Sequence, residues 1–382
     1  MQTFWLFIVA LALGSLQAFV YRLVTRKAIT YQRSFTQSGA FCGEHVEMVE
    51  VLENRSPLPI PFVRAESRIS PHIHLGANTP QETEQDARMV SGDMYHRSLF
   101  FLHSFSRVTR RHPVTLTHRG YFDAGSVTLT SGDLLGVSAN VHSMDTGAAI
   151  AVYPAPCEPG DIPLPCRTFV GEMLVRRFIE PDPFFMCGTR DYRLGDEARF
   201  VNPRASARTQ NLQVNTFDFT ADPNLLIAFN IQLSQSQWDN LSPEQLERVE
   251  QALQICAALA LDTLSAGAGV GFCANSSVVN DTEQEAYLEP ARESDQAQAF
   301  LELLARLTLR RTRNFYTTLS SLNPPPGTDV LILTPYTSRK IEDAAQQLRE
   351  SGRRVLVHVL EGIAPASTDN GGDGDDYDDR IA

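Results

Sequence analysis

Hydrophobic and polar positions divide the chain into stretches of different periodicity. The first stretch is an uncharged apolar run of eighteen residues, Phe4–Tyr21. From about residue 40 to 155, short segments such as Val46–Leu52 alternate apolar and polar positions, as half-buried strands do. After about residue 224, short apolar runs alternate with longer segments of helical spacing. These patterns predict an α+β multidomain protein.

The apolar run predicts a transmembrane helix over residues 1–24. As a helix it would be about 27 Å long, close to the hydrocarbon thickness of a bilayer. A buried core helix and a cleaved signal peptide are the alternatives, but no Lys or Arg precedes the run as a signal peptide would require. Arg22, Arg26, Lys27 and Arg33 follow it. Because basic residues favour the cytoplasmic side, we expect a single-pass inner-membrane protein with a cytoplasmic main body.

The alternating segments predict a β-sandwich domain over residues 25–155. Glycine and proline residues punctuate them, and the polar stretch Gly76–Met94 is expected to be a loop. The expected strands are Val46–Leu52, Phe62–Ile69, Ser98–Val108, Pro113–His118 and Ser126–Thr130.

The C-terminal pattern predicts an α/β domain over residues 224–362, with an open, mostly parallel sheet. Ser242, Pro243 and Gln245 have the spacing of a helix start, with a capping box and proline at the first position. The expected strands are Leu225–Phe229, Gly269–Cys273, Asp329–Thr334 and Val355–Leu360, and further helices are expected at Gln296–Leu309 and Ser338–Glu350.

Charge changes the picture at the C-terminus. The chain has 382 residues, a length typical of two to three domains, and a formal net charge of −12. The last fourteen residues contain six aspartates and one arginine, so they contribute −5 of that charge. We expect residues 363–382 to be a disordered acidic tail. So acidic a chain is not expected to bind nucleic acid, and six cysteines without a C-x-x-C pair fit a reducing compartment.

The densest polar stretch is Gly188–Arg208, within a segment of its own over residues 156–223. It holds five arginines and three acidic residues, Asp191, Asp196 and Glu197. Guanidinium groups interleaved with carboxylates can form an ion-pair network at a domain junction. The alternative is that the same arginines clamp a phosphate or an acidic partner peptide. A third interpretation is a hydrolase or nuclease that uses the acidic cluster.

The same stretch resembles a family signature. RDYRLGDEARFVNPRASAR is similar to the motif of the bacterial domain-of-unknown-function 58 family, and Pro203 stands where that motif usually has Trp. Further similarities, such as Arg119-Gly120-Tyr121, extend the resemblance from the N-terminal run to about Leu360. The residues singled out for partner docking or a structural role are Arg190, Tyr192, Gly195, Asp196, Arg199, Arg204 and Arg208.

The resemblance implies a von Willebrand factor A fold in the C-terminal half and an unsettled biochemical role. Members are often encoded beside MoxR-type AAA+ ATPases. We therefore expect a membrane-anchored cytoplasmic interaction or assembly protein, without enzymatic activity, that has protein partners including a MoxR-type ATPase.

A von Willebrand A domain often binds Mg²⁺ through an Asp-x-Ser-x-Ser loop after its first strand. Here the corresponding positions are Asn230, Gln232 and Ser234. Because hard cations need charged oxygen ligands, this degenerate loop predicts no bound metal and no cofactor. A metal-dependent adhesion module is the alternative. His72 and His74 lack a third ligand at zinc spacing and are expected to be a solvated strand edge.

Overall fold

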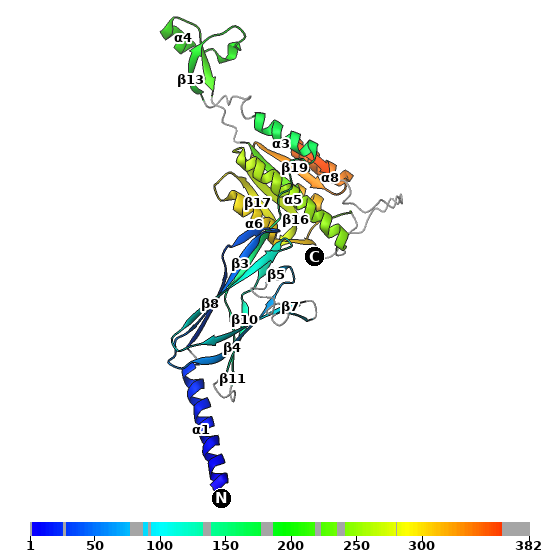
Figure 1. The fold of residues 1–382 in the computed structure, drawn as a ribbon. Helices are drawn as coiled ribbons and strands as arrows, with labels where there is room; N and C mark the ends of the chain where they lie inside the picture. Colours follow the sequence, from blue (N-terminus) through cyan, green and yellow to red (C-terminus); the bar gives the residue numbers. More distant parts are fainter. Residues whose placement is uncertain are drawn as a thin grey trace, which may run out of the picture. The chain divides into compact units, whose positions relative to one another are not determined.

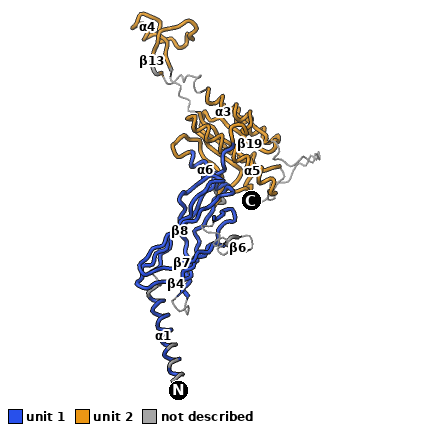
Figure 2. Tube along the Cα trace, in the orientation of Figure 1, with its two compact units in different colours: residues 1–157, 297–307 blue, residues 158–296, 308–382 orange. Residues whose placement is uncertain are grey.

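The computed structural model describes residues 2–25, 28–76, 87–90, 93–132, 139–176, 186–217, 223–234, 241–279 and 281–360. The predicted acidic tail, residues 363–382, lies outside them. The chain divides into two compact units (Figure 2): residues 1–157 with 297–307, and residues 158–296 with 308–382.

The predicted apolar segment forms one continuous helix, α1 (Gln2–Thr25). Large apolar side chains along it, including Trp5, Leu11 and Phe19, are exposed. In the described parts of the chain, no helix combines the length and the apolar character that crossing a membrane requires. The helix is confirmed, and its insertion into a membrane stays a prediction.

Three sheets build the β domain of the first unit (Figure 1). The first has the order β1 (Ile29–Phe35), β3 (His45–Asn54), β8 (Arg107–Leu116), β5 (Ile73–Leu75). The second has the order β11 (Ala139–Asp145), β10 (Ser126–Gly132), β4 (Ile60–Ile69), β7 (Asp93–Leu102), β6 (Ala87–Val90). The third is β2 (Gly39–Phe41), β12 (Ala149–Tyr153), β9 (Gly120–Asp123).

The inward faces of these strands form two separate apolar clusters. One contains Leu52 of β3, Phe100 of β7 and Leu129 of β10. The other contains Met48 of β3 and Val114 of β8. Successive residues of a strand point to opposite faces, so Met48 and Leu52 share the inward face of β3. The position between them, on that same face, is Glu50.

The second unit contains a sheet of the order β17 (Asp281–Ala291), β16 (Gly269–Val278), β15 (Asn224–Phe229), β19 (Thr328–Thr334), β20 (Val355–Val359). All neighbours pair in parallel except β16 with β17. This confirms a mixed, mostly parallel sheet.

Helices pack on this sheet. The helix α5 (Pro243–Ser265) packs against β16, and α8 (Arg339–Glu350) and α3 (Leu164–Arg176) pack against β20. The short helix α7 (Phe315–Ser321) shares an apolar cluster with α8. The predicted capping box of α5 is present, since Ser242 and Gln245 hydrogen-bond each other's backbone N–H groups. Ser338 caps α8, since its side chain accepts a hydrogen bond from the backbone N–H of Ile341.

Several expected element boundaries were wrong. The segment Ser98–Val108 is two strands, β7 and β8, joined by a turn at residues 103–106. The expected loop Gly76–Met94 contains β6, and the segment between the expected strand Gly269–Cys273 and the expected helix at Gln296 contains the end of β16 and all of β17. The helix α6 (Gln296–Arg306) ends earlier than expected because the chain continues as β18 (Leu307–Arg311). In β17 the exposed side chains of Tyr287 and Glu289 alternate with buried or half-buried ones, and this polar, half-exposed pattern concealed the strand.

Candidate functional site

The Arg-rich stretch forms a small substructure. The strands β13 (Met186–Asp191) and β14 (Gln213–Phe217) pair as an antiparallel ladder. Between them lie a 3₁₀ turn, η1 (Ala198–Phe200), and the helix α4 (Pro203–Thr209). Asn202 caps α4 through the backbone N–H of Ala205, and its amide also donates to Asn215 of β14 at 2.7 Å. These bonds attach α4 to the ladder.

Arg190 and Asp196 form a bidentate ion pair within this substructure. Nη1 and Nη2 of Arg190 each lie 2.7 Å from a carboxylate oxygen of Asp196. The backbone N–H of Arg193 donates to the same carboxylate at 2.7 Å. Gly195 has φ of 108°, a conformation that favours glycine, so it allows this turn. The hydrogen bonds from Arg190 and then from Arg193 lower the pKa of Asp196 to about 2.

The other signature residues are displayed. The side chains of Arg193, Arg199, Arg204 and Arg208 are exposed, and Leu194 is fully exposed. Neither η1 nor α4 contains a buried residue. Tyr192 is also exposed, and Arg199 forms an exposed pair with Glu197. The signature residues therefore do not meet in one pocket, and only Arg190 and Asp196 act as a structural pair.

The three acidic residues of the stretch do not form a paired acid–base site. Asp191 accepts a hydrogen bond from the Gln213 amide, Asp196 binds Arg190, and Glu197 faces Arg199. A general acid needs a raised pKa, whereas that of Asp196 is lowered. The geometry gives no support to the hydrolase interpretation.

The degenerate loop follows β15 at the carboxyl edge of the parallel strands. The strands of the second unit have the spatial order 3-2-1-4-5, counted along the chain from β15 to β20 without β18, so the order reverses between β15 and β19. Ligands of such sheets bind outside the carboxyl ends at this switch point. Asn230 and Thr334 lie there, one after β15 and one at the end of β19.

Amide and hydroxyl groups bridge this switch point. Nδ2 of Asn230 donates to Oγ1 of Thr334 at 3.0 Å, and Oδ1 of Asn230 accepts from the Asn275 amide at 3.1 Å. The amide of Gln232 donates to the backbone oxygen of Ser234 at 2.7 Å. Asn230, Asn275 and Thr334 are buried. The degenerate loop thus supplies neutral groups that already hydrogen-bond one another, a poor ligand set for a hard cation.

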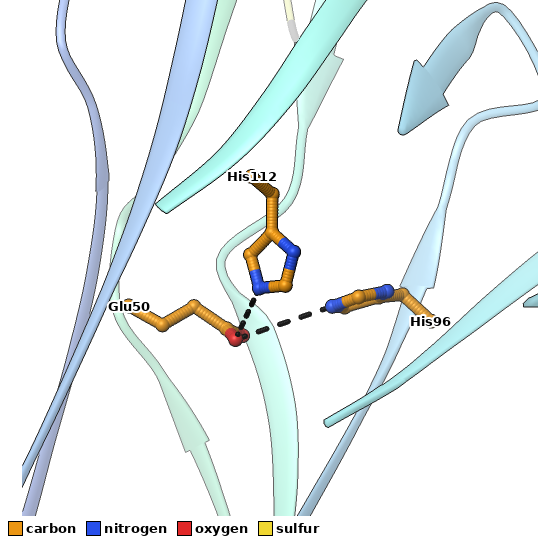
Figure 3. Close-up of side chains that lie close together, drawn as sticks. All are labelled: Glu50, His96 and His112. Atoms are coloured by element: carbon orange, nitrogen blue, oxygen red, sulfur yellow. Dashed lines mark hydrogen bonds and ion pairs between the residues drawn. The ribbon is translucent and has the colours of Figure 1, made fainter. Parts of the chain in front are cut away.

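A second polar cluster lies inside the β domain, and sequence reasoning missed it. Glu50 of β3 and His112 of β8 come from one sheet, and His96 of β7 comes from the other (Figure 3). All three are buried, and their ligand-type atoms lie within 4.8 Å of one another. Nε2 of His112 is 3.0 Å from Oε2 of Glu50, and Nε2 of His96 is 4.0 Å from it.

Further donors complete the contacts of the Glu50 carboxylate. Oε1 accepts from the Tyr31 hydroxyl at 2.6 Å and from Nη2 of Arg33 at 2.7 Å. Oε2 accepts from the Ser98 hydroxyl at 2.8 Å. Because that hydroxyl proton points to Glu50, the 2.9 Å contact between Ser98 and Nε2 of His96 requires the proton on Nε2.

The pKa values follow from this arrangement. Burial raises the pKa of Glu50, but the hydrogen bond from His112 and the charge of Arg33 hold it well below its usual value. Burial lowers the pKa of His96 to about 4. Burial and then the charge of Glu50 raise the pKa of Tyr31. At neutral pH the cluster therefore holds an ionised Glu50 and a neutral His96.

Two histidines and a carboxylate are a known ligand set for zinc and for iron. Here Arg33 already neutralises Glu50, and both side chains have no solvent exposure. A divalent cation would add two uncompensated charges to a buried site, which is costly. The atoms that would bind the metal already have partners, since Nε2 of His96 carries a proton and Nε2 of His112 contacts the Glu50 carboxylate. The cluster is best described as a hydrogen-bonded polar layer between the two apolar clusters.

A signal for this layer was present in the sequence. Glu50 shares the inward phase of β3 with Met48 and Leu52, so a charge at that position requires a buried partner. Arg33 has the same inward phase as Tyr31 on β1. The alternation of apolar and acidic positions along β3 is also that of a plain half-buried strand, so Glu50 does not stand out in the sequence.

A third histidine, His118, lies next to the pair of His72 and His74. His72 precedes β5, and its ring lies 4.4 Å from that of His118, centroid to centroid. Burial, and then His118 and His74, lower the pKa of His72. All three side chains are exposed.

The fold and these clusters define a multidomain α+β protein: sandwich-like β sheets and a mostly parallel, helix-covered sheet. Residues 188–360 match the family model described as "Protein of unknown function DUF58". The chain thus carries a DUF58 family domain, and this match begins within the Arg-rich stretch. No curated protein matches the sequence.

Solved structures show distant similarity. A cohesin module from the family 33 glycoside hydrolase of Clostridium perfringens is 11% identical, with 32% of this chain and 98% of that chain covered and a TM-score of 0.21. The sixth cohesin from scaffoldin B of Acetivibrio cellulolyticus is 12% identical, with 32% and 98% covered and a TM-score of 0.23. The CARDB domain of the PF1109 protein from Pyrococcus furiosus is 11% identical, with 33% and 94% covered and a TM-score of 0.20. Similarities this low carry no argument about function.

Proposed function

We propose that this protein is a membrane-anchored interaction or assembly protein that docks a partner through the Arg-rich substructure, residues 186–217. The observation that carries the proposal is the exposure of Arg193 and Leu194 in the turn after β13 and of Arg204 and Arg208 on α4. Among the residues described, none forms a salt bridge with these three arginines. Exposed guanidinium forks and an exposed apolar side chain are suited to a partner surface that is acidic and has a small apolar pocket.

The substructure is held in shape without using these side chains. The pair of Arg190 and Asp196 fixes the turn, and Asn202 attaches α4 to β14. A preorganised surface loses less entropy on binding, which favours an interaction role over a purely structural one.

The proposed location is the inner membrane, with α1 as the single anchor and the main body in the cytoplasm. The exposed apolar side chains of α1 support insertion into an apolar environment. The basic residues that follow the apolar run support a cytoplasmic body.

A MoxR-type AAA+ ATPase is the partner we propose, on the resemblance of the chain to a family often encoded beside such ATPases. A von Willebrand A-like architecture of the second unit is part of the same proposal. The strand order 3-2-1-4-5 with one antiparallel edge strand supports it.

The test measures binding of the purified ATPase to the full-length protein by biolayer interferometry. The variant Arg204→Glu with Arg208→Glu should weaken binding roughly tenfold or more, since charge reversal removes interfacial cation contacts. The matched control is Arg310→Glu with Arg339→Glu, two exposed arginines of β18 and α8. Equal affinity of both variants and the unmodified protein would contradict the proposal.

A further inference from the structure

Four exposed apolar residues gather at one end of the β domain. Phe101 and Leu99 share the outward face of β7, and Phe105 lies in the turn after it. The ladder of β4 and β7 shifts between the pairs Ile60–Leu102 and Val63–Phe100, so Phe62 lies in the bulged step opposite Phe101. We call Phe62, Leu99, Phe101 and Phe105 the aromatic tip.

The turn of the aromatic tip holds a phenylalanine where glycine would be favoured. Phe105 has φ of 48°, and its side chain is 72% exposed. A side chain in the left-handed region is strained, and this one gains little from contacts with the protein. The backbone is held there by the hydrogen bond from Phe105 N–H to the Ser56 carbonyl, at 3.1 Å. The geometry thus presents an aromatic ring to the exterior.

The same end of the β domain receives the end of α1. The Tyr21 hydroxyl donates to the Pro59 carbonyl at 2.9 Å, and the Arg55 N–H donates to the Ala28 carbonyl at 2.9 Å. Buried Asn54 connects this loop to the turn of the tip, because its amide donates to the carbonyls of Leu58 and His103. The end of α1, the loop at residues 55–59 and the aromatic tip are therefore parts of one hydrogen-bonded end.

Basic residues border the aromatic tip along β7 and after its turn, and others follow the apolar run of α1. Along β7, Arg97 lies two positions beyond Leu99 on the same face and pairs with Glu66 of β4. Arg107 is exposed immediately after the turn. In the sequence, Arg22, Arg26 and Lys27 follow the apolar run of α1. Aromatic side chains bordered by basic ones are typical of the interface of an anionic bilayer.

We propose that the aromatic tip inserts into the interfacial layer of an anionic lipid bilayer, beside the point where α1 leaves it. This inference rests on the proposed membrane anchoring through α1. It adds a second lipid contact, which fixes the β domain against the membrane instead of leaving it on a free tether.

The experiment uses single-tryptophan forms of the full-length protein in phosphatidylcholine–phosphatidylglycerol vesicles that contain brominated lipids. The chain has two tryptophans, Trp5 and Trp238. Trp238→Phe leaves Trp5 as the reporter of α1. Phe105→Trp in a Trp5→Phe, Trp238→Phe background reports the tip. Tyr287→Trp in that background is the matched control, because Tyr287 is a half-exposed aromatic residue on β17.

Bromines near the headgroup should quench the Phe105→Trp reporter several-fold more than the Tyr287→Trp control. Strong quenching of Trp5, with the Phe105→Trp reporter no more quenched than the control, overturns the tip contact and leaves the α1 anchor intact. If Trp5 is also unquenched, both proposals fail. Phe101→Trp is the second reporter, for use if the Phe105 variant does not fold, and the same outcomes apply to it.

Discussion

Nη2 of Arg33 lies 2.7 Å from Oε1 of Glu50, and neither side chain has any exposure to solvent. The pair joins β1 to β3 inside the β domain, and Ser98 and His96 bring the second sheet to the same carboxylate. Apolar clusters lie on both sides of this layer along β3. A shift of the strand by two residues would place Glu50 in an apolar cluster, so the pair specifies the register of the sheets.

Removing one member of this pair should be strongly destabilising. Arg33→Met leaves Glu50 charged and buried, and we expect a loss of about 3–5 kcal/mol in the free energy of unfolding. The measurement is urea unfolding of the detergent-solubilised protein. In a double-mutant cycle with Glu50→Gln, the double variant should lose clearly less than the sum of the single losses. Strict additivity would contradict the coupling.

The β domain should be sensitive to acid. The folded pKa values of His96 and Glu50 lie below their ordinary values of 6.5 and 4.5, so their contributions are complete at neutral pH and are lost as the pH falls. For His96 the loss occurs between pH 6.5 and about 4 and amounts to about 3 kcal/mol. Arg33, Arg110, Glu50 and His112 are the charged or titratable groups that act on it.

The check is the free energy of unfolding measured from pH 7 to 4. His96→Asn should reduce the dependence of the free energy of unfolding on pH, because the neutral amide does not titrate. His142→Asn, at an exposed histidine of β11, is the control and should leave it unchanged. Equal slopes for both variants would exclude His96 as the source.

Chelators should leave the β domain unaffected. Because Arg33 neutralises Glu50, we expect EDTA to change neither the unfolding midpoint nor the far-ultraviolet spectrum of the protein. Elemental analysis of protein purified with added zinc should find no stoichiometric metal. One equivalent of zinc that is lost in His112→Asn, with the fold retained, would show that the polar layer is a metal site.

Asp196→Asn should loosen the Arg-rich substructure only locally. The variant keeps an acceptor but loses the charge that binds Arg190 and the N–H of Arg193. We expect faster hydrogen exchange at the backbone amide of Arg193, with an unchanged global unfolding midpoint. Global unfolding of the variant would instead indicate that the pair supports a domain junction.

Asn230→Asp should destabilise the second unit. A carboxylate cannot donate to Thr334, and its charge would be buried at a position with no solvent exposure. We expect a loss of about 1–3 kcal/mol in the free energy of unfolding. If millimolar Mg²⁺ partly restores the stability of this variant, a carboxylate at position 230 is all that this edge of the sheet lacks for binding a cation. An unchanged stability would contradict the bridging role of Asn230.

Local signals made much of the fold predictable. The box of Ser242 and Gln245, and the apolar runs at Leu225–Phe229 and Asp329–Thr334, specify their elements without help from distant residues. The polar layer joins β1 and β3 to β7 and β8, and Ser98 and His112 lie 48 and 62 residues from Glu50 in the chain, so no single window contains it. Whether the Arg-rich stretch is buried or displayed also depends on tertiary structure, because its alternating charges fit both arrangements.

The antiparallel edge strand β17 disfavours pairing between two copies of the protein. Its sequence includes Glu283, Glu285 and Glu289, and Pro290 has no N–H to offer a neighbouring strand. Two such edges repel each other and cannot form a continuous ladder. This edge of the sheet is thereby protected from strand-to-strand pairing with a second copy of the protein.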